Sequence, residues 1–229
     1  KIFHLTSDTF SYIFMILPNG HLGQLYCGRK VRDREDFSNL LELYSRIMSP
    51  CIYDDCSYVS LENIKQEYPV YGTTDYRYPA IDVLQKNGSR ISEFRYESHV
   101  IRSGKPSLEG LPATYVESED EAETLILTLR DELTGVVLEL SYTVFARDGV
   151  LARNVRVKNE GEDTVFLNRV MSLNLDLPDA DYDWIQFSGA WSRERTPVQR
   201  RLTSGTQSVG SMRGHSSAHQ NPFVILKRP

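Results

Sequence analysis

Hydrophobic and polar residues alternate with a period of two along most of the chain from about Asp82 onward, as they do in β-strands that bury one face. In residues 152–158, for example, valines alternate with asparagine, arginine and lysine. The predicted strands are 81–84, 94–101, 124–129, 136–145, 152–158 and 165–177. Because they follow one another closely with no helical pattern between them, the chain is predicted to be all-β, an antiparallel sandwich with solvated outer faces.

Turn signals separate the predicted strands. They lie at Asn87-Gly88-Ser89, 131–135, Arg147-Asp148-Gly149 and 159–163. The first of them also fits a glycosylation sequon, but Asn-Gly is a common hairpin turn and nothing else in the sequence indicates secretion. We therefore interpret it as a turn.

The N-terminal third of the chain is less regular. Residues 10–17 and 21–26 flank Pro18-Asn19-Gly20 and are predicted to form a β-hairpin. Three further segments are predicted to be a short helix with one apolar stripe, a single serine-capped helical turn and an ordered loop: 36–48, 60–66 and 67–79.

No internal repeat or change of composition marks a domain boundary, so residues 1–229 are predicted to be one domain. The chain begins at Lys1 rather than at a methionine, and residues 223–227 form a strand pattern with no partner strand after it. We therefore expect the sequence to be part of a longer protein, truncated at its C-terminal end within the sandwich. Strand edges left unpaired in this way would favour self-association.

Composition excludes two classes of partner. The chain has 31 acidic and 26 basic side chains, whereas proteins that bind nucleic acid present a basic face. No apolar run approaches the ~20 residues that span a membrane, and residues 10–17 lack the basic leader and cleavage site of a signal peptide. We expect neither nucleic acid nor a membrane as a partner.

The three cysteines, Cys27, Cys51 and Cys56, cannot all pair with one another. The last two lack a nearby third and fourth ligand for a zinc site. We therefore predict reduced thiols in a cytoplasmic protein that holds no metal and no cofactor.

Residues 180–195 carry both tryptophans of the chain, two further aromatic rings and five charges. A buried strand does not accommodate so many charges, and a solvated loop has little use for two indoles. Exposed rings beside carboxylates and guanidinium groups suit a polar ring-shaped ligand such as a sugar, or a tight protein contact. The segment is therefore predicted to be a functional surface.

Asp179, Asp181 and Asp183 have the spacing of the first three ligands of a calcium loop. Such a loop needs glycine at its sixth position and glutamate at its twelfth, where this chain has Trp184 and Ala190. No calcium site is predicted, and the carboxylates are expected to cap turns or to pair with nearby guanidinium groups. The partners expected for Asp181 and Asp183 are Arg193 and Arg195.

Three other clusters carry no complete catalytic site. Residues 212–222 hold two histidines and two serines, but they lack the nucleophile elbow of a serine hydrolase and the helical pattern of a zinc protease. Residues 117–123 are acidic and are predicted to be a solvated face. Asp54 and Asp55 are adjacent, so in a strand they would point to opposite faces.

Four longer segments of the chain form a recognisable set: 66–77 (QEYPVYGTTDYR), 110–117 (GLPATYVE), 187–195 (FSGAWSRER) and 213–223 (RGHSSAHQNPF). In this order and spacing they resemble the N-terminal domain of the bacterial α-galactosidases of glycoside hydrolase family 36. The last one departs from the family pattern, because Ala218 stands between the two serines and His219.

The resemblance implies an N-terminal β-supersandwich that is followed by a catalytic (β/α)8 barrel and a small C-terminal β-domain. Hydrolysis in the family is retaining and uses two aspartates of the barrel, one as nucleophile and one as acid/base. The barrel motifs are absent from this sequence, so the chain alone is predicted to be inactive. The partners implied are its own catalytic barrel, an α-galactoside substrate and further copies of the protein, because family members often form tetramers.

In such tetramers, loops of the N-terminal domain can reach the active site of a neighbouring subunit. Some members place an aspartate just before the segment that matches 46–50, but this chain has Ser45 there, so that sugar contact is not carried over. The candidates for lining the barrel mouth or the subunit interface are Tyr71, Asp75, Trp184 and Trp191. The alternative is that these side chains only pack the edge of the sandwich against the barrel.

Two other functions remain open at this stage. One is a free-standing β-sandwich module that binds carbohydrate or another protein. The other is the N-terminal domain of an α-N-acetylgalactosaminidase, since that specificity is set by loops of the barrel.

Overall fold

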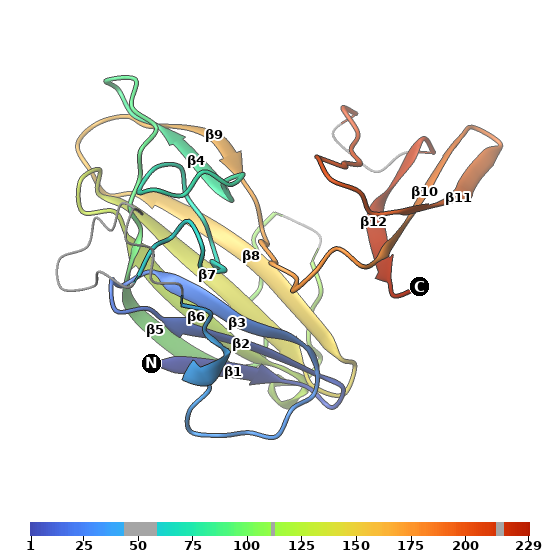
Figure 1. Ribbon diagram of the computed structural model, residues 1–229, viewed down its shortest axis with the longest axis horizontal. Helices are drawn as coiled ribbons and strands as arrows, with labels where there is room; N and C mark the ends of the chain where they lie inside the picture. The colour runs from blue at the N-terminus through green and yellow to red at the C-terminus, as the bar shows by residue number, and fades with distance from the viewer. Residues whose placement is uncertain (44–58, 111–112, 214–217) are drawn as a thin grey trace. The chain divides into compact units, whose positions relative to one another are not determined.

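The computed structural model describes residues 1–43, 59–110, 113–213 and 218–229, and it divides into two compact units, Lys1–Asp176 and Leu177–Pro229 (Figure 1). The described residues form antiparallel strands and two short 3-10 helices, so the all-β prediction is confirmed. None of their helices is long and apolar enough to cross a membrane. The prediction of a single domain stays a prediction.

The first unit is a β-sandwich of two main sheets (Figure 1). Its strands are β1 (Ile2–Thr6), β2 (Phe10–Ile16), β3 (Leu22–Arg29), β4 (Ile81–Leu84), β5 (Arg95–Ser103), β6 (Glu123–Arg130), β7 (Val136–Phe145), β8 (Val150–Asn159) and β9 (Phe166–Val170). Strands β1-β2-β3 form one sheet, β5-β6-β7-β8 form the facing sheet, and β4 pairs with β9 in a third sheet of two strands. The 3-10 helices are η1 (Ser38–Leu40) and η2 (Glu119–Glu121).

The core lies between the two main sheets and follows directly from the alternation in the sequence. In β6, Leu125, Leu127 and Leu129 point inward and are almost fully buried. The register places Leu127 opposite Leu140 and Leu125 opposite Tyr142 of β7, so the buried rows continue across the sheet. Residues of the β1–β3 sheet close the other side of the same core.

The second unit is one antiparallel sheet in the order β11-β10-β12. Its strands are β10 (Asp183–Ala190), β11 (Arg193–Arg201) and β12 (Gln220–Lys227). Among its described residues none is buried, in contrast to the first unit. Phe187 stacks on Phe223 at 5.2 Å between ring centroids, which joins β10 to β12. The aromatic segment 180–195 is therefore mostly strand and hairpin turn.

Most of the predicted strands are confirmed, including the hairpin of β2 and β3. The prediction of one strand over 165–177 is wrong, because β9 ends at Val170. The apolar pattern continues past the end of β9 because Met171 and Leu175 still pack on the core. Beyond β9 the backbone forms a hydrogen bond with a side chain: the amide of Asp176 donates to Gln24 Oε1 at 2.8 Å.

The two helical segments predicted in the N-terminal third are largely turns and extended chain in the structure. Within the described part of 36–48 only η1 is helical, and the chain is already extended at Leu41. Residues 60–66 contain a turn in which the Asn63 amide donates to the Ser60 carbonyl at 3.3 Å, and no helix. The predictions that involve Ser45, Cys51, Asp54, Asp55, Cys56 and His215 lie outside the described residues.

Candidate functional site

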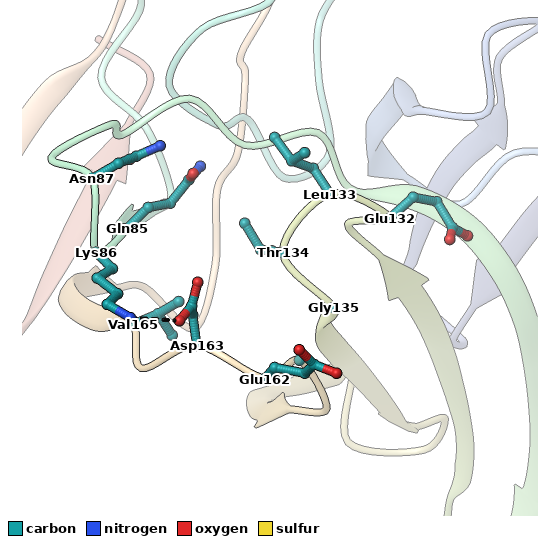
Figure 2. A pocket seen from close by; sticks show the side chains of 11 residues that line it. Gln85, Lys86, Asn87, Glu132, Leu133, Thr134, Gly135, Glu162, Asp163 and Val165 are labelled. Atoms are coloured by element: carbon teal, nitrogen blue, oxygen red, sulfur yellow. Dashed lines mark hydrogen bonds and ion pairs between the residues drawn. The ribbon is translucent and has the colours of Figure 1, made fainter.

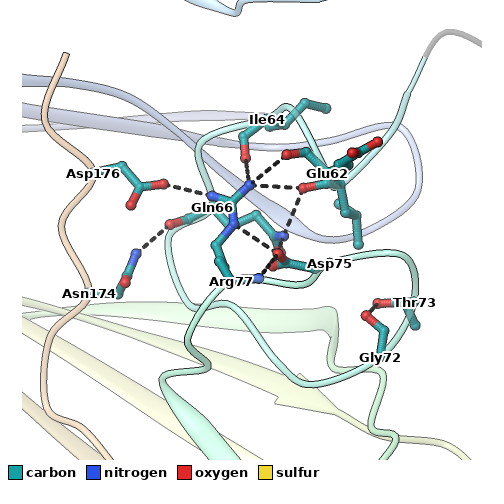
Figure 3. Close-up of polar contacts among 10 residues, drawn as sticks. Glu62, Ile64, Gln66, Gly72, Thr73, Asp75, Arg77, Asn174 and Asp176 are labelled. Carbon is teal, nitrogen blue, oxygen red and sulfur yellow. Dashed lines mark hydrogen bonds and ion pairs between the residues drawn. The ribbon is translucent and has the colours of Figure 1, made fainter. Parts of the chain in front are cut away.

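The loop before β4 is anchored by one guanidinium group (Figure 3). Arg77 Nε donates to Asp75 at 2.9 Å and Nη1 donates to Asp176 at 2.8 Å. Its Nη2 donates to the carbonyls of Leu61 at 3.0 Å and Ile64 at 2.8 Å. Three chain segments are thereby tied to one side chain whose planar fork carries several donors.

Asp75, a predicted site residue, lies inside this anchor and is only 2% exposed. Its carboxylate accepts hydrogen bonds from Gln66 Nε2 at 2.5 Å and from the Arg77 amide at 3.1 Å. Burial raises the pKa of Asp75, and the contacts with Arg77 oppose that shift. In this structure Asp75 fixes the shape of the loop from within.

The anchor holds a strained turn. Gly72, Thr73 and Thr74 have φ angles of 103°, 53° and 67°. Positive φ is rare for β-branched residues, and each such residue costs about 1–3 kcal/mol. The Asp75 amide closes the turn on the Gly72 carbonyl at 3.1 Å. Strain of this kind persists only where the surrounding contacts impose it, and the Arg77 anchor supplies those contacts.

Aromatic rings stand on the outside of the same loop. Tyr71, also a predicted site residue, is 45% exposed, and Tyr76 and Tyr78 are 83% and 64% exposed. The guanidinium of Arg90 lies 5.0 Å from the ring centre of Tyr71, and that of Arg169 lies 3.7 Å from the ring centre of Tyr78. Such cation–π pairs hold amphipathic rings at a surface, where they suit a contact with another molecule.

Strand β9 adds apolar side chains that are also exposed. Phe166, Leu167 and Val170 are 60%, 47% and 41% exposed. Exposed apolar side chains that gather on one element mark interaction sites more often than scattered ones do. The loop tyrosines and these residues of β9 are called the loop surface below.

The remaining predicted site residues lie on the hairpin of the second unit. Trp184 is half-buried in β10, and its Nε1 donates to Gln186 Oε1 at 2.7 Å. Trp191 lies in the turn between β10 and β11 and is 87% exposed. The next residue, Ser192, has a φ of 63°, so the turn is tight. Trp191 is therefore an exposed indole at a hairpin tip.

The expected pairing of Arg193 and Arg195 with the aspartates of this hairpin is wrong. Arg201 makes the ion pairs with Asp181 and Asp183 instead. The reason is the antiparallel register, which places Asp183 opposite Arg201 and leaves Arg193 at the other end of the hairpin.

One hollow of about 760 Å³ lies between three turns of the first unit (Figure 2). Its lining includes Gln85, Thr134 and Val165. Lys86 and Asp163 form an ion pair at 3.0 Å across one side, and both side chains are largely exposed. An exposed pair of this kind contributes little energy and holds no reacting group in place.

A buried carboxylate that the sequence did not reveal lies in the core. Glu67 is fully buried and accepts hydrogen bonds from Tyr12 at 2.6 Å and Tyr142 at 2.7 Å. Arg153 lies 3.6 Å from the same carboxylate. Burial raises the pKa of Glu67, and Arg153 opposes that shift. Because no substrate can enter between these residues, the group is structural.

The described residues contain no group of three or more histidine, cysteine, aspartate or glutamate side chains that could hold a metal ion. Asp75 and Asp176 are linked through Arg77, which pairs with the first at 2.9 Å and with the second at 2.8 Å. A retaining glycosidase needs two carboxylates that flank the sugar bond. The carboxylates of Asp75 and Asp176 are instead bound to the guanidinium group of Arg77.

Comparison with known proteins gives one consistent result. The sequence profile described as "Glycosyl hydrolase family 36 N-terminal domain" matches residues 20–229. The chain is 44% identical over 99% of its length to alpha-galactosidase AgaA of Geobacillus stearothermophilus and 35% identical to alpha-galactosidase 1 of Pediococcus pentosaceus, and it covers 31% of each.

Solved structures agree with the sequence comparison. The crystal structure of an alpha-galactosidase from Lactobacillus brevis matches all of this chain with a TM-score of 0.94 and 40% identity, over 31% of its own length. The raffinose complex of a variant of the Geobacillus enzyme matches 99% of the chain with a TM-score of 0.92 and 43% identity, also over 31% of its length. The chain therefore spans about a third of the length of the relatives that it matches.

Proposed function

We propose that this chain, which belongs to the N-terminal domains of glycosyl hydrolase family 36, is the non-catalytic N-terminal part of an α-galactosidase. The enzyme would hydrolyse terminal α-linked galactose from oligosaccharides, on a catalytic barrel outside these 229 residues. The proposal is supported by relatives that are alpha-galactosidases and by a match that runs over nearly the whole chain.

The observation that carries a docking role is the sheet of the second unit. In β12, Phe223, Val224, Ile225 and Leu226 are each between 38% and 49% exposed, so apolar side chains lie on both faces of the strand. A strand that is apolar on both faces is typical of sheets that are covered on both sides. We therefore assign this sheet to the contact with the catalytic barrel.

The loop surface is assigned to a second contact, with the barrel or with a neighbouring subunit of an oligomer. Its exposed tyrosines, paired with arginines, have the composition of protein interface cores. Trp191 is assigned to an interface for the same reason, because tryptophan, like tyrosine and arginine, is enriched among interface hot spots. The role of this chain is thus to support the barrel and the assembly of the enzyme.

We also place the protein in the cytoplasm. Cys27 is a free, half-buried thiol, as expected of a protein kept under reducing conditions.

Substitution of Trp191 in the complete enzyme tests the docking role. Trp191→Ala is expected to weaken the assembly, because truncation of a tryptophan hot spot removes about 2 kcal/mol or more of binding energy. The readouts are molar mass by light scattering across a dilution series and turnover of an α-galactoside. Val150→Ala, at an exposed apolar residue of the sandwich, is the control. An unchanged mass and turnover in the Trp191 variant would contradict this role.

A further inference from the structure

Two turns of the first unit contain an Asn-Gly pair and have the same backbone hydrogen bonds. They are residues 17–21 and 85–89, with asparagine third and glycine fourth in each. In 85–89 the Gln85 amide donates to the Ser89 carbonyl at 2.8 Å, and the Gly88 amide donates to the Gln85 carbonyl at 2.9 Å. The equivalent distances in 17–21 are also 2.8 Å and 2.9 Å. The two turns can therefore be compared directly.

The asparagine side chain is part of each turn. Asn87 Oδ1 accepts the Ser89 amide at 2.9 Å, and Asn19 Oδ1 accepts the His21 amide at 3.1 Å. A donor on this oxygen stabilises the negative charge that develops there when a nucleophile adds to the carboxamide carbon. The backbone nitrogen of the following glycine is such a nucleophile, and glycine has no side chain to hinder it. Both turns therefore hold the groups for an intramolecular attack.

The turn 85–89 is open to solvent. Asn87 and Gly88 are both exposed, and Asn87 is one of the residues that line the hollow of about 760 Å³ (Figure 2). A Cβ atom built at Gly88 would have no atom of the described residues within 4 Å. Water therefore reaches the carboxamide, and the backbone has room to change its conformation.

The turn 17–21 is packed into the sandwich. Asn19 is 7% exposed, and its carboxamide nitrogen, the leaving group of such an attack, is buried. The Gly20 carbonyl accepts the Tyr96 amide at 2.8 Å, and a Cβ atom at Gly20 would lie 3.4 Å from Cβ of Arg95. Ring closure between Asn19 and Gly20 would have to displace these neighbours, which a close-packed interior resists.

We propose that Asn87 is a site of spontaneous deamidation and that the fold protects Asn19 from the same reaction. The Gly88 nitrogen loses its proton to solvent and bonds to Cγ of Asn87, and the carboxamide nitrogen takes up a proton and leaves as ammonia. Water then opens the five-membered imide at either carbonyl carbon, which gives aspartate or isoaspartate. The reaction consumes water and releases ammonia, so it needs no oxidant and no cofactor, and it does not depend on the docking role.

The reaction changes both the charge and the backbone of this turn. Either product adds a negative charge to a hollow whose lining already holds three acidic side chains and one basic one. Isoaspartate also lengthens the main chain of the turn by one carbon atom, which breaks the fit between the Gly88 amide and the Gln85 carbonyl. Modified copies of the protein therefore carry a more acidic surface at this point and exchange the amide hydrogens of the turn faster.

The test incubates the full 229-residue chain at mildly alkaline pH, folded and unfolded in guanidinium chloride, and follows isoaspartate by peptide mass spectrometry. The folded chain is expected to form isoaspartate at Asn87 and to keep Asn19 intact. The unfolded chain is expected to react at both positions, because the packing around Asn19 is gone, and it sets the time scale. No isoaspartate at Asn87 in the folded chain by the time both positions of the unfolded chain have reacted would overturn the site. Equal rates at Asn87 and Asn19 in the folded chain would overturn the protection.

Gly88→Ala tests the identity of the nucleophile. The added methyl group hinders the attacking nitrogen, so the rate of isoaspartate formation at Asn87 is expected to fall by about tenfold or more. Gly205→Ala is the matched control, because Gly205 also has a positive φ, of 98°, and open space around it. This control should leave the rate at Asn87 unchanged. Equal rates in the two variants would contradict an attack by the Gly88 nitrogen.

Discussion

Glu67 and Arg153 place two opposite charges inside the sandwich, where their side chains are 0% and 4% exposed. The guanidinium also lies 3.5 Å from the ring centre of Tyr142, so the pair is enclosed by aromatic groups. Removal of one charge from a buried pair is more damaging than the pair is stabilising, because the other charge stays behind without compensation.

We therefore expect Glu67→Gln to lower the free energy of unfolding by about 3 kcal/mol, measured by urea denaturation. Glu97→Gln is the matched control: Glu97 pairs with Arg130 at 2.9 Å but is 44% exposed, so its loss should be much smaller. An equal loss of unfolding free energy in the two variants would contradict a larger contribution of the buried pair to stability.

His21 makes the stability of the fold depend on pH. It is 4% exposed, and burial lowers its pKa from 6.5 to about 4, with Glu93 opposing that shift and Arg95 adding to it. Between pH 6.5 and pH 4 the unfolded chain binds a proton at this histidine and the folded chain does not. The full stability is thus present above pH 6.5, and it is lost as the pH falls toward 4.

The expected slope from this group is at most about 1.4 kcal/mol per pH unit. His21→Gln should remove that part of the slope in urea denaturation between pH 6.5 and 4.5. The same variant at pH 7.5, where the histidine is neutral in both states, controls for the substitution itself. An unchanged slope would show that His21 is not held neutral in the fold.

Among the structural elements, the loop before β4 is held by the contacts of one of its own residues, Arg77. Arg77→Lys keeps the charge but cannot form the bonds to Asp75, Asp176 and the two carbonyls at once. We expect a loss of about 2–3 kcal/mol and faster hydrogen exchange at the amides of Asp75 and Arg77. Arg102→Lys, on the exposed part of β5, is the control, and equal exchange in the two variants would contradict the anchor.

The strands of the sandwich were predictable because their alternation has a direct physical cause. Each inward leucine of β6 must meet another apolar residue across the core, so the pattern of one strand implies the face of the next. The pattern could not reveal that β9 ends at Val170, because Met171 and Leu175 keep packing on the core without a partner strand.

The polar groups of the candidate site were predictable only in part. The residues of 66–77 could be singled out, but not the role of Asp75, since burial depends on how the loop folds back on Arg77. Arg201 could not be chosen over Arg193 as the partner of Asp183, because the choice depends on a register that shifts near Ser188. Glu67 was missed for a similar reason: Tyr12 and Tyr142 are far from it in sequence.

Across the whole molecule, the two units differ in whether they bury residues in a core of their own. The sandwich unit has a core with fully buried residues such as Phe14, Leu127 and Leu138. In the sheet of β10, β11 and β12, by contrast, no described residue is buried. A sheet that lacks a core of its own buries its apolar side chains only against a partner surface, which is the reason for the docking role proposed above.

We propose that these 229 residues support catalysis by another part of the enzyme and perform none themselves. Hydrolysis of p-nitrophenyl α-galactoside by the purified chain is the measurement that checks this proposal, with the complete enzyme as the positive control. We expect no turnover above the uncatalysed rate, because the two aspartates of a retaining mechanism are proposed to lie on a barrel outside these residues. Sustained turnover that scales with the concentration of the chain would contradict it.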